Sequence, residues 1–183
     1  MAHAGKLNRE MIVHEAIALL NEGGLEAVSL RRIAERLDAR APSLARHVGD
    51  KNQLLALVSS TIFGEALDLV PPHLSGDAWL EAYGHALRRK QSETRDIPAL
   101  LSTVPPDQAI NDATTGRLLR MMHEAGLEGP RALVEQSAIQ ALVTGWMTFE
   151  KSRRADLFAA RLPTDHAFEY SLTALIAGFA VTR

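Results

Sequence analysis

The sequence has no cysteine and no hydrophobic run long enough to cross a membrane. The absence of cysteine excludes a disulfide scaffold and thiolate chemistry, and it fits a reducing compartment. The longest apolar stretch, residues 172–181, is too short to span a bilayer. Residues 1–20 lack the continuous apolar core of a signal peptide. We therefore expect a cytoplasmic protein with no membrane partner.

A strong charge of either sign is also missing. The net charge is −2. Residues 1–60 hold eight Lys/Arg and seven Asp/Glu, a net of +1, and the remaining residues hold 12 and 15, a net of −3. Charge alone therefore does not indicate a nucleic-acid partner, and any affinity for DNA must come from the placement of individual cations. The cations concerned are Arg31, Arg32, Arg36, Arg40, Arg46 and Lys51.

Motifs of catalysis and metal binding are absent as well. Neither His14-Glu15 nor His123-Glu124 is followed by a second histidine in the spacing of a zinc protease. The chain has no glycine-rich phosphate loop and no cysteine nucleophile. We expect no enzyme activity, and hence no catalytic residue, no metal and no cofactor.

The chain does have the length and composition of a two-domain globular protein. It has 183 residues, of which 46% are hydrophobic and 23% charged. We expect a head at residues 1–52 and a helical body at residues 53–183, with a connecting helix that starts at residue 51.

Residues 29–51 hold the most informative pattern. Leu30, Ile33, Ala34 and Leu37 recur at the spacing of a short amphipathic helix. Residues 38–40 break this pattern, and Pro42 suits the first turn of a second helix. One side of the second helix carries Leu44, Ala45 and Val48, and the helix is predicted to bury Leu44 and Val48. The other side is predicted to present Pro42, Ser43, Arg46 and His47.

Two short helices with such an outward face are typical of a helix-turn-helix DNA reader. The same pattern would fit two helices of an ordinary bundle. The start of the chain favours the reader, because a helix capped by Asn8 and stopped by Gly23-Gly24 precedes it. The head is therefore predicted to be a three-helix domain.

The rest of the chain is predicted to be helical, with no strand. Proline and glycine pairs and capping residues divide it. The predicted helices cover residues 51–70, 77–93, 97–103, 107–125, 130–154 and 165–181, with a loop and a short helical piece at 155–164. The predicted fold class is all-α.

The head resembles the TetR (tetracycline repressor) family of bacterial regulators. The family pattern is matched over residues 7–58 by Ser29, Arg31, Ile33, Ala34, Leu37, Leu44, His47, Val48, Lys51 and Leu54. The likeness is strongest to the tetracycline repressors, whose reader helix also runs Pro-Thr-Leu and then His-Val. It implies an N-terminal helix-turn-helix domain and a C-terminal ligand-binding and dimerisation domain.

By this resemblance, the partner is near-palindromic double-stranded operator DNA. We expect Arg31, Ser43 and Arg46 to contact base edges, since arginine is the commonest reader of guanine. Pro42 would pack on a thymine methyl or sugar. His47 and Lys51 would hold phosphates, and the protein would be associated with the nucleoid when bound to DNA.

Three departures from the family pattern alter this interface. Asp38-Ala39 replaces the usual Gly-Val turn, and Ala45 replaces a tyrosine that usually contacts a phosphate. Ala41 stands where the tetracycline repressors carry a base-reading glutamine. The operator must therefore differ.

The last helix, residues 167–181, is apolar nearly all round and must be buried on more than one side. A second copy of the chain would cover it, which fits the family's dimeric four-helix bundle. The alternative is the central helix of a monomeric core. The predicted homodimer interface comprises Leu142, Phe168, Leu172, Leu175, Ile176 and Phe179.

The resemblance also implies a pocket for a small-molecule effector. The predicted lining is Trp79, Tyr83, Leu87, Leu101, Val104, Met122, Gln140, Val143, Trp146 and Met147. Each of these residues would equally fit an ordinary core. Leu101 and Val104 replace the His and Thr that would bind magnesium, and Ala86 replaces an Asn, so a hydrophobic or aromatic effector fits better than tetracycline–magnesium.

We therefore predict a DNA-binding transcription regulator, a repressor released from its operator by such a ligand. The alternative function is a helical ligand-binding or protein-interaction module that does not bind an operator.

Overall fold

The computed structural model describes residues 7–105, 107–158 and 163–181. All regular structure in these residues is helical, and they contain no strand, as the sequence predicts. The elements are α1 (Arg9–Gly23), η1 (Leu25–Ala27), α2 (Leu30–Arg36), α3 (Ala41–Val48), α4 (Lys51–Asp68), α5 (Gly76–Ser92), α6 (Ile97–Thr103), α7 (Gln108–Glu124), α8 (Gly129–Glu150), α9 (Arg153–Phe158) and α10 (Thr164–Val181).

The chain divides into two compact units. The first unit comprises residues 1–64 and 93–115, and the second unit comprises residues 65–92 and 116–183. The long helices α4 and α7 contribute to both units. The first unit thus contains α6 as well as the predicted head, while the domain boundary after residue 52 stays a prediction.

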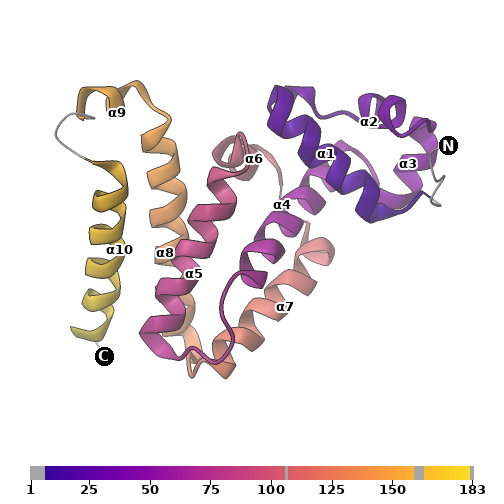
Figure 1. The fold of residues 1–183 in the computed structure, drawn as a ribbon. Helices are drawn as coiled ribbons and strands as arrows, with labels where there is room; N and C mark the ends of the chain where they lie inside the picture. Colours follow the sequence, from indigo (N-terminus) through magenta and orange to yellow (C-terminus); the bar gives the residue numbers. More distant parts are fainter. Residues whose placement is uncertain (1–6, 106, 159–162, 182–183) are drawn as a thin grey trace. The chain divides into compact units, whose positions relative to one another are not determined.

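The first unit is built on the contacts of α1, α2 and α3 with one another (Figure 1). Its core consists of aliphatic side chains that these helices share with the first half of α4. Leu100 of α6 belongs to the same core. The most buried members include Ile12, Leu19, Ile33, Leu44 and Leu54, each 0–1% exposed. Burial of such side chains contributes about 1.5–3 kcal/mol each, so the head is stabilised chiefly by these aliphatic contacts.

The signals that begin and end α1 are those predicted from the sequence. The Asn8 side chain accepts a hydrogen bond from the backbone N–H of Met11 at 2.8 Å. At the other end Gly24 has φ +75°, a conformation that favours glycine, and its N–H donates to the Leu20 carbonyl. The short helix η1 that follows carries no periodic pattern and was not predicted.

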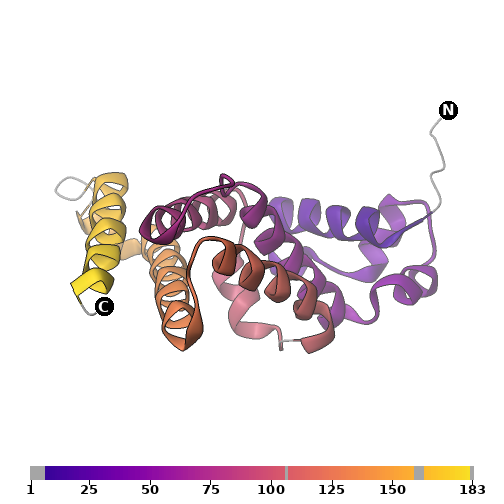
Figure 2. The same cartoon turned by 90° about the horizontal axis from the view of Figure 1, so that it is seen from below.

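In the second unit α5, α8 and α10 pack against one another (Figures 1 and 2). Gly84 on α5 makes the close approach possible, because a Cβ there would lie 2.9 Å from both terminal methyl carbons of Leu172 on α10. The predicted breaks hold: α4 ends before Pro71-Pro72, and Gly126 follows α7 with φ +75°. Helix α9 is the short helical piece predicted for 155–164, although it starts at Arg153, and residues 159–162 lie outside the described part.

Candidate functional site

The turn between α2 and α3 explains why Asp38 can replace a glycine. Ser29 caps α2 by accepting the N–H of Arg32 at 3.3 Å. Asp38 follows the helix with φ +47°, in the left-handed region that aspartate tolerates better than most residues. The Ala39 N–H donates to the Ala34 carbonyl at 2.9 Å and closes the turn. The aspartate therefore supplies the backbone conformation of a glycine turn.

Helix α3 buries Leu44 and Val48, as predicted, and these side chains are 0% and 3% exposed. Pro42 and Arg46 are exposed, and Ser43 and His47 are half-buried. Ala45 is exposed, because it lies at the edge of the stripe that Leu44 and Val48 define.

Arg46 and Ser43 are in contact on this surface. Arg46 is exposed, and its Nη2 lies 3.4 Å from the Ser43 hydroxyl oxygen, which accepts a weak hydrogen bond. Two residues predicted to read bases thus lie next to each other on α3. Such a contact is easily exchanged for a ligand group.

Arg31 and Lys51, which are also predicted to contact DNA, lie before and after α3 in the sequence, and both are exposed. The Arg31 Nε donates to Glu35 Oε1 at 2.9 Å, and both side chains are largely exposed. An exposed ion pair within one helix contributes little stability, so Arg31 can leave it at low cost. Lys51 begins α4, whose start is fixed by reciprocal hydrogen bonds between Asp50 and Gln53.

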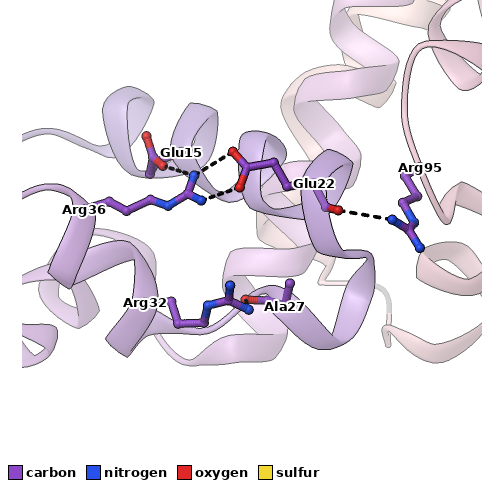
Figure 3. A network of polar contacts seen from close by, with 6 residues as sticks. All are labelled: Glu15, Glu22, Ala27, Arg32, Arg36 and Arg95. Atoms are coloured by element: carbon purple, nitrogen blue, oxygen red, sulfur yellow. Dashed lines mark hydrogen bonds and ion pairs between the residues drawn. The ribbon is translucent and has the colours of Figure 1, made fainter.

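Other arginines of the head are engaged within it (Figure 3). Arg36 on α2 donates to Glu15 at 2.9 Å and pairs with Glu22, both on α1. The hydrogen bonds to Glu22 and Glu15 raise the pKa of Arg36, and the hydrogen bond that Glu22 accepts from Arg36 lowers the pKa of Glu22. Arg32 donates to the Ala27 carbonyl at 3.2 Å. Arg36 and Arg32 are therefore engaged within the head, whereas DNA contact by Arg31, Arg46 and Lys51 stays a prediction.

The segment before α6 is bonded to the end of α1. The Arg95 backbone N–H donates to Asn21 Oδ1 at 2.9 Å. The Arg95 guanidinium donates to the Glu22 carbonyl at 3.2 Å (Figure 3). Asp96, with φ +56°, accepts the Leu25 N–H at 3.0 Å. Sequence reasoning missed these contacts, because they join residues more than 70 positions apart and leave no local pattern.

The predicted pocket residues do not share one unit. Leu101 and Val104 pack against the core of the first unit, whereas the other predicted residues belong to the second unit. Tyr83 stacks on Trp79 with ring centroids 5.2 Å apart, and its hydroxyl accepts a hydrogen bond from Gln136 Nε2 at 2.7 Å. Gln136 Nε2 also lies 3.1 Å from Gln140 Oε1. Burial raises the pKa of Tyr83 to about 12.

The remaining predicted pocket residues lie in the core or near α10. Leu87, Val143 and Met147 are buried. Trp146 contacts Phe168 edge-on and donates to Glu150 Oε1 at 3.0 Å. Met122 lines a separate surface groove of about 290 Å³. The sequence shows only that these residues are apolar and at helical spacing, which does not distinguish a core position from a pocket position. The pocket therefore stays a prediction.

Three residues of the predicted dimer interface are used inside the chain, and the prediction is wrong for them. Phe168, Leu172 and Ile176 are 0%, 1% and 7% exposed, because this side of α10 packs on α5 and α8. Leu142, Leu175 and Phe179 are half-buried. The opposite side of α10, which includes Tyr170, Ala174 and Ala177, is exposed.

In the described part of the chain, no cluster of three or more His, Asp or Glu side chains could hold a metal ion. No helix in that part is long and apolar enough to cross a membrane.

Comparison with known proteins points to one family. A sequence profile described as "Bacterial regulatory proteins, tetR family" matches residues 12–58, which cover most of α1, then α2, α3 and the start of α4. Together with the relatives and solved structures given next, this match supports a TetR-family regulator.

Similarity to known proteins extends over most of the chain. It is 29% identical to the class D tetracycline repressor of Escherichia coli over 155 residues, which cover 83% of this chain and 70% of the relative. Among solved structures, ActR of Streptomyces coelicolor in complex with actinorhodin is similar with a TM-score of 0.78 and 25% identity, covering 97% of each chain. A variant of TetR from Acinetobacter baumannii AYE in complex with minocycline is similar with a TM-score of 0.76 and 25% identity, covering 97% of this chain and 95% of that one.

Proposed function

We propose that this TetR-family protein is a cytoplasmic homodimer that binds a near-palindromic operator through α3 and is released by a small hydrophobic or aromatic ligand. The observation that carries the proposal is the exposed surface of α3, in which Arg46 and Ser43 lie side by side above a fully buried Leu44. A surface helix whose apolar side is locked in a core can enter a major groove without exposing that core.

The proposed roles follow from exposure and chemistry. Arg46, Ser43 and Arg31 would read base edges, and Pro42 would contact a thymine methyl or sugar. Lys51 and His47 would hold phosphates and fix the register of the head on the duplex. We propose no catalytic step, since these groups serve binding alone.

Two heads must reach successive major grooves about 34–36 Å apart, which requires a dimer. The exposed side of α10 and the neighbouring exposed stripe of α8 supply a surface for a second copy. Val134 on α8 is 66% exposed and Tyr170 on α10 is 77% exposed, while Ala141, Gly145 and Ala177 leave room for close helix packing. Half-buried Leu142, Leu175 and Phe179 would lie at the edges of this interface.

Release by a ligand requires that the ligand bind one head spacing more tightly than the other. The solved structures of ActR and of the Acinetobacter TetR variant are complexes with actinorhodin and minocycline, both small molecules. An effector of the same general size is proposed here.

A gel-shift experiment with the DNA that flanks the protein's own gene tests the proposal. We expect a discrete complex that survives excess non-specific DNA. The double variant Arg46→Ala/Lys51→Ala should lose it, whereas the control Arg120→Ala, an exposed arginine of α7, should retain it. Equal binding by both variants, or no specific complex with the unaltered protein, would favour the alternative of a ligand-binding or protein-interaction module.

A further inference from the structure

The second unit contains a cavity of about 530 Å³ that the predicted pocket does not describe. It lies between the end of α4, the α4–α5 turn, the start of α5 and α7. Trp79 is the one predicted pocket residue in its lining. The full lining is Leu67, Asp68, Val70, Pro71, Pro72, His73, Leu74, Trp79, Arg117, Met121, Glu124 and Ala125.

The buried residues of the cavity lining are apolar, and the cavity has a size that suits a small organic molecule. Leu67, Val70 and Trp79 are 3–5% exposed in the chain as a whole, so they form a fixed floor. Trp79 is held by its stack on Tyr83, which is itself hydrogen-bonded to Gln136. Known ligand pockets of about 300–1,000 Å³ combine a mainly apolar lining with a few polar groups, and this lining holds eight apolar and four polar or charged residues.

The wall formed by the α4–α5 turn is held in place before any ligand arrives. Pro71-Pro72 restricts the backbone, and His73 takes a left-handed conformation with φ +69°. At the end of the turn the Gly76 N–H donates to the Ala125 carbonyl at 2.8 Å, which ties the turn to the end of α7. A preformed wall lowers the ordering cost of binding.

The polar rim carries a net negative charge. Arg117 Nη2 donates to Asp68 Oδ1 at 2.6 Å, so these two groups neutralise each other. Glu124 is exposed and makes no ion pair in the described part of the chain. With His73 neutral, the formal charge of the lining is one positive and two negative, or −1.

From this cavity and its charge we infer that it binds a lipophilic monocation, an aromatic compound whose single positive charge lies toward Glu124. The apolar floor accepts the hydrophobic body, and the unpaired carboxylate compensates the charge. An anion of the same shape would meet Glu124 directly, and it would compete with Asp68 for the positive charge of Arg117. The inference rests on the proposed function, because it names the chemical class of the ligand that releases the protein from its operator.

Calorimetry with two probes of nearly equal shape and opposite charge tests the inference. We expect tetraphenylphosphonium to bind the full-length protein one to one and tetraphenylborate to bind at least tenfold more weakly. Glu124→Gln should weaken phosphonium binding about two- to fivefold, as expected for one partly exposed charge pair. The control Glu81→Gln, an exposed glutamate of α5 outside the cavity, should leave binding unchanged.

A second variant keeps the test decisive if the charge effect is small. Met121→Arg places a cation in the cavity wall and should abolish phosphonium binding, with an unchanged circular dichroism spectrum showing that the protein is folded. Equal or tighter binding of the borate, no phosphonium binding, or phosphonium binding that persists in Met121→Arg would overturn the inference. Because no operator is present, failure here leaves the gel-shift result untouched, and loss of operator binding leaves the calorimetric result standing.

Discussion

At the scale of single residues, the head separates arginines that build it from arginines that face outward. Arg36 forms ion pairs with α1, and Arg32 donates a hydrogen bond to the Ala27 carbonyl. Arg46 makes only a weak hydrogen bond to Ser43. All three are arginines of one short stretch. Helical periodicity predicts that Arg46 faces outward, but it gives no sign that Arg36 and Arg32 are engaged within the head. The distinction predicts different consequences for their removal.

Arg46→Ala should weaken operator binding by about 1–3 kcal/mol, concentrated at one base pair, because a lost bidentate base contact relaxes specificity only there. The measurement is binding to a set of operators with single base changes. Arg36→Ala serves as contrast, since it should lower the melting temperature by releasing α2 from α1. A uniform loss of affinity across all sequences for Arg46→Ala would show instead that it holds a phosphate.

Tyr83 should reveal its burial by its ionisation. The chain has two tyrosines, so in a Tyr170→Phe background the ultraviolet titration reports Tyr83 alone. Its midpoint should lie near pH 12, because burial raises the pKa to about 12 from 10. Since the folded pKa is the higher one, the stability from the neutral phenol is complete below pH 10 and is lost as pH rises from 10 to 12. A midpoint near 10 in the folded protein would contradict this environment.

At the scale of elements, α10 is fastened to the second unit at both ends. Arg88 on α5 donates to Glu150 at 2.8 Å and to Asp165 at 2.7 Å, and its guanidinium carbon lies 4.2 Å from the Phe168 ring centroid. At the other end Arg131 on α8 donates to the Phe179 carbonyl at 2.6 Å. Between these ends Leu172 packs against Gly84. The fastening determines which side of α10 remains outside.

Arg88→Met should lower the free energy of unfolding by about 1–3 kcal/mol, because Glu150 loses a charged hydrogen-bond partner in a half-buried place. Urea denaturation followed by circular dichroism measures it. Arg120→Met, which replaces an exposed arginine of α7, is the control and should change stability by less than about 0.5 kcal/mol. An equal effect of the two substitutions would show that the junction at Arg88 contributes no specific stability.

At the scale of the whole molecule, pairing of two copies is the property that the operator proposal requires. The exposed side of α10 carries Tyr170 and small residues such as Ala174 and Ala177, and the buried side packs on the chain's own helices. A charge placed on the exposed side should therefore prevent pairing without disturbing the fold of the single chain.

Ala177→Glu should give monomers by light scattering at concentrations where the unaltered protein is a dimer, because an unpaired carboxylate in a helix interface costs several kcal/mol. Ala99→Glu, an exposed position of α6, is the matched control and should remain dimeric. A dimer that persists in Ala177→Glu would move the interface away from α10. Leu175→Glu is less suitable, since Leu175 is half-buried within its own chain.

Much of this structure could be predicted because its signals are local. Asn8, Gly24 and Ser29 act on the backbone within a few residues, and the periodicity of Leu44 and Val48 marks the buried side of α3 directly. The weakest interpretations were those that depend on which apolar side meets which neighbour. A helix that is apolar all round, such as α10, offers no local signal for that choice.

The sequence by itself determined the all-α fold, the capped three-helix head and the outward face of α3, because caps, turns and periodic burial are properties of contiguous residues. Tertiary structure alone decided that Phe168 and Leu172 face inward, that Arg36 pairs with carboxylates of α1, and that Asp96 accepts the N–H of Leu25 just after α1. Each of these outcomes depends on the packing of segments distant in the chain, where several partners of equal chemistry compete and geometry selects one.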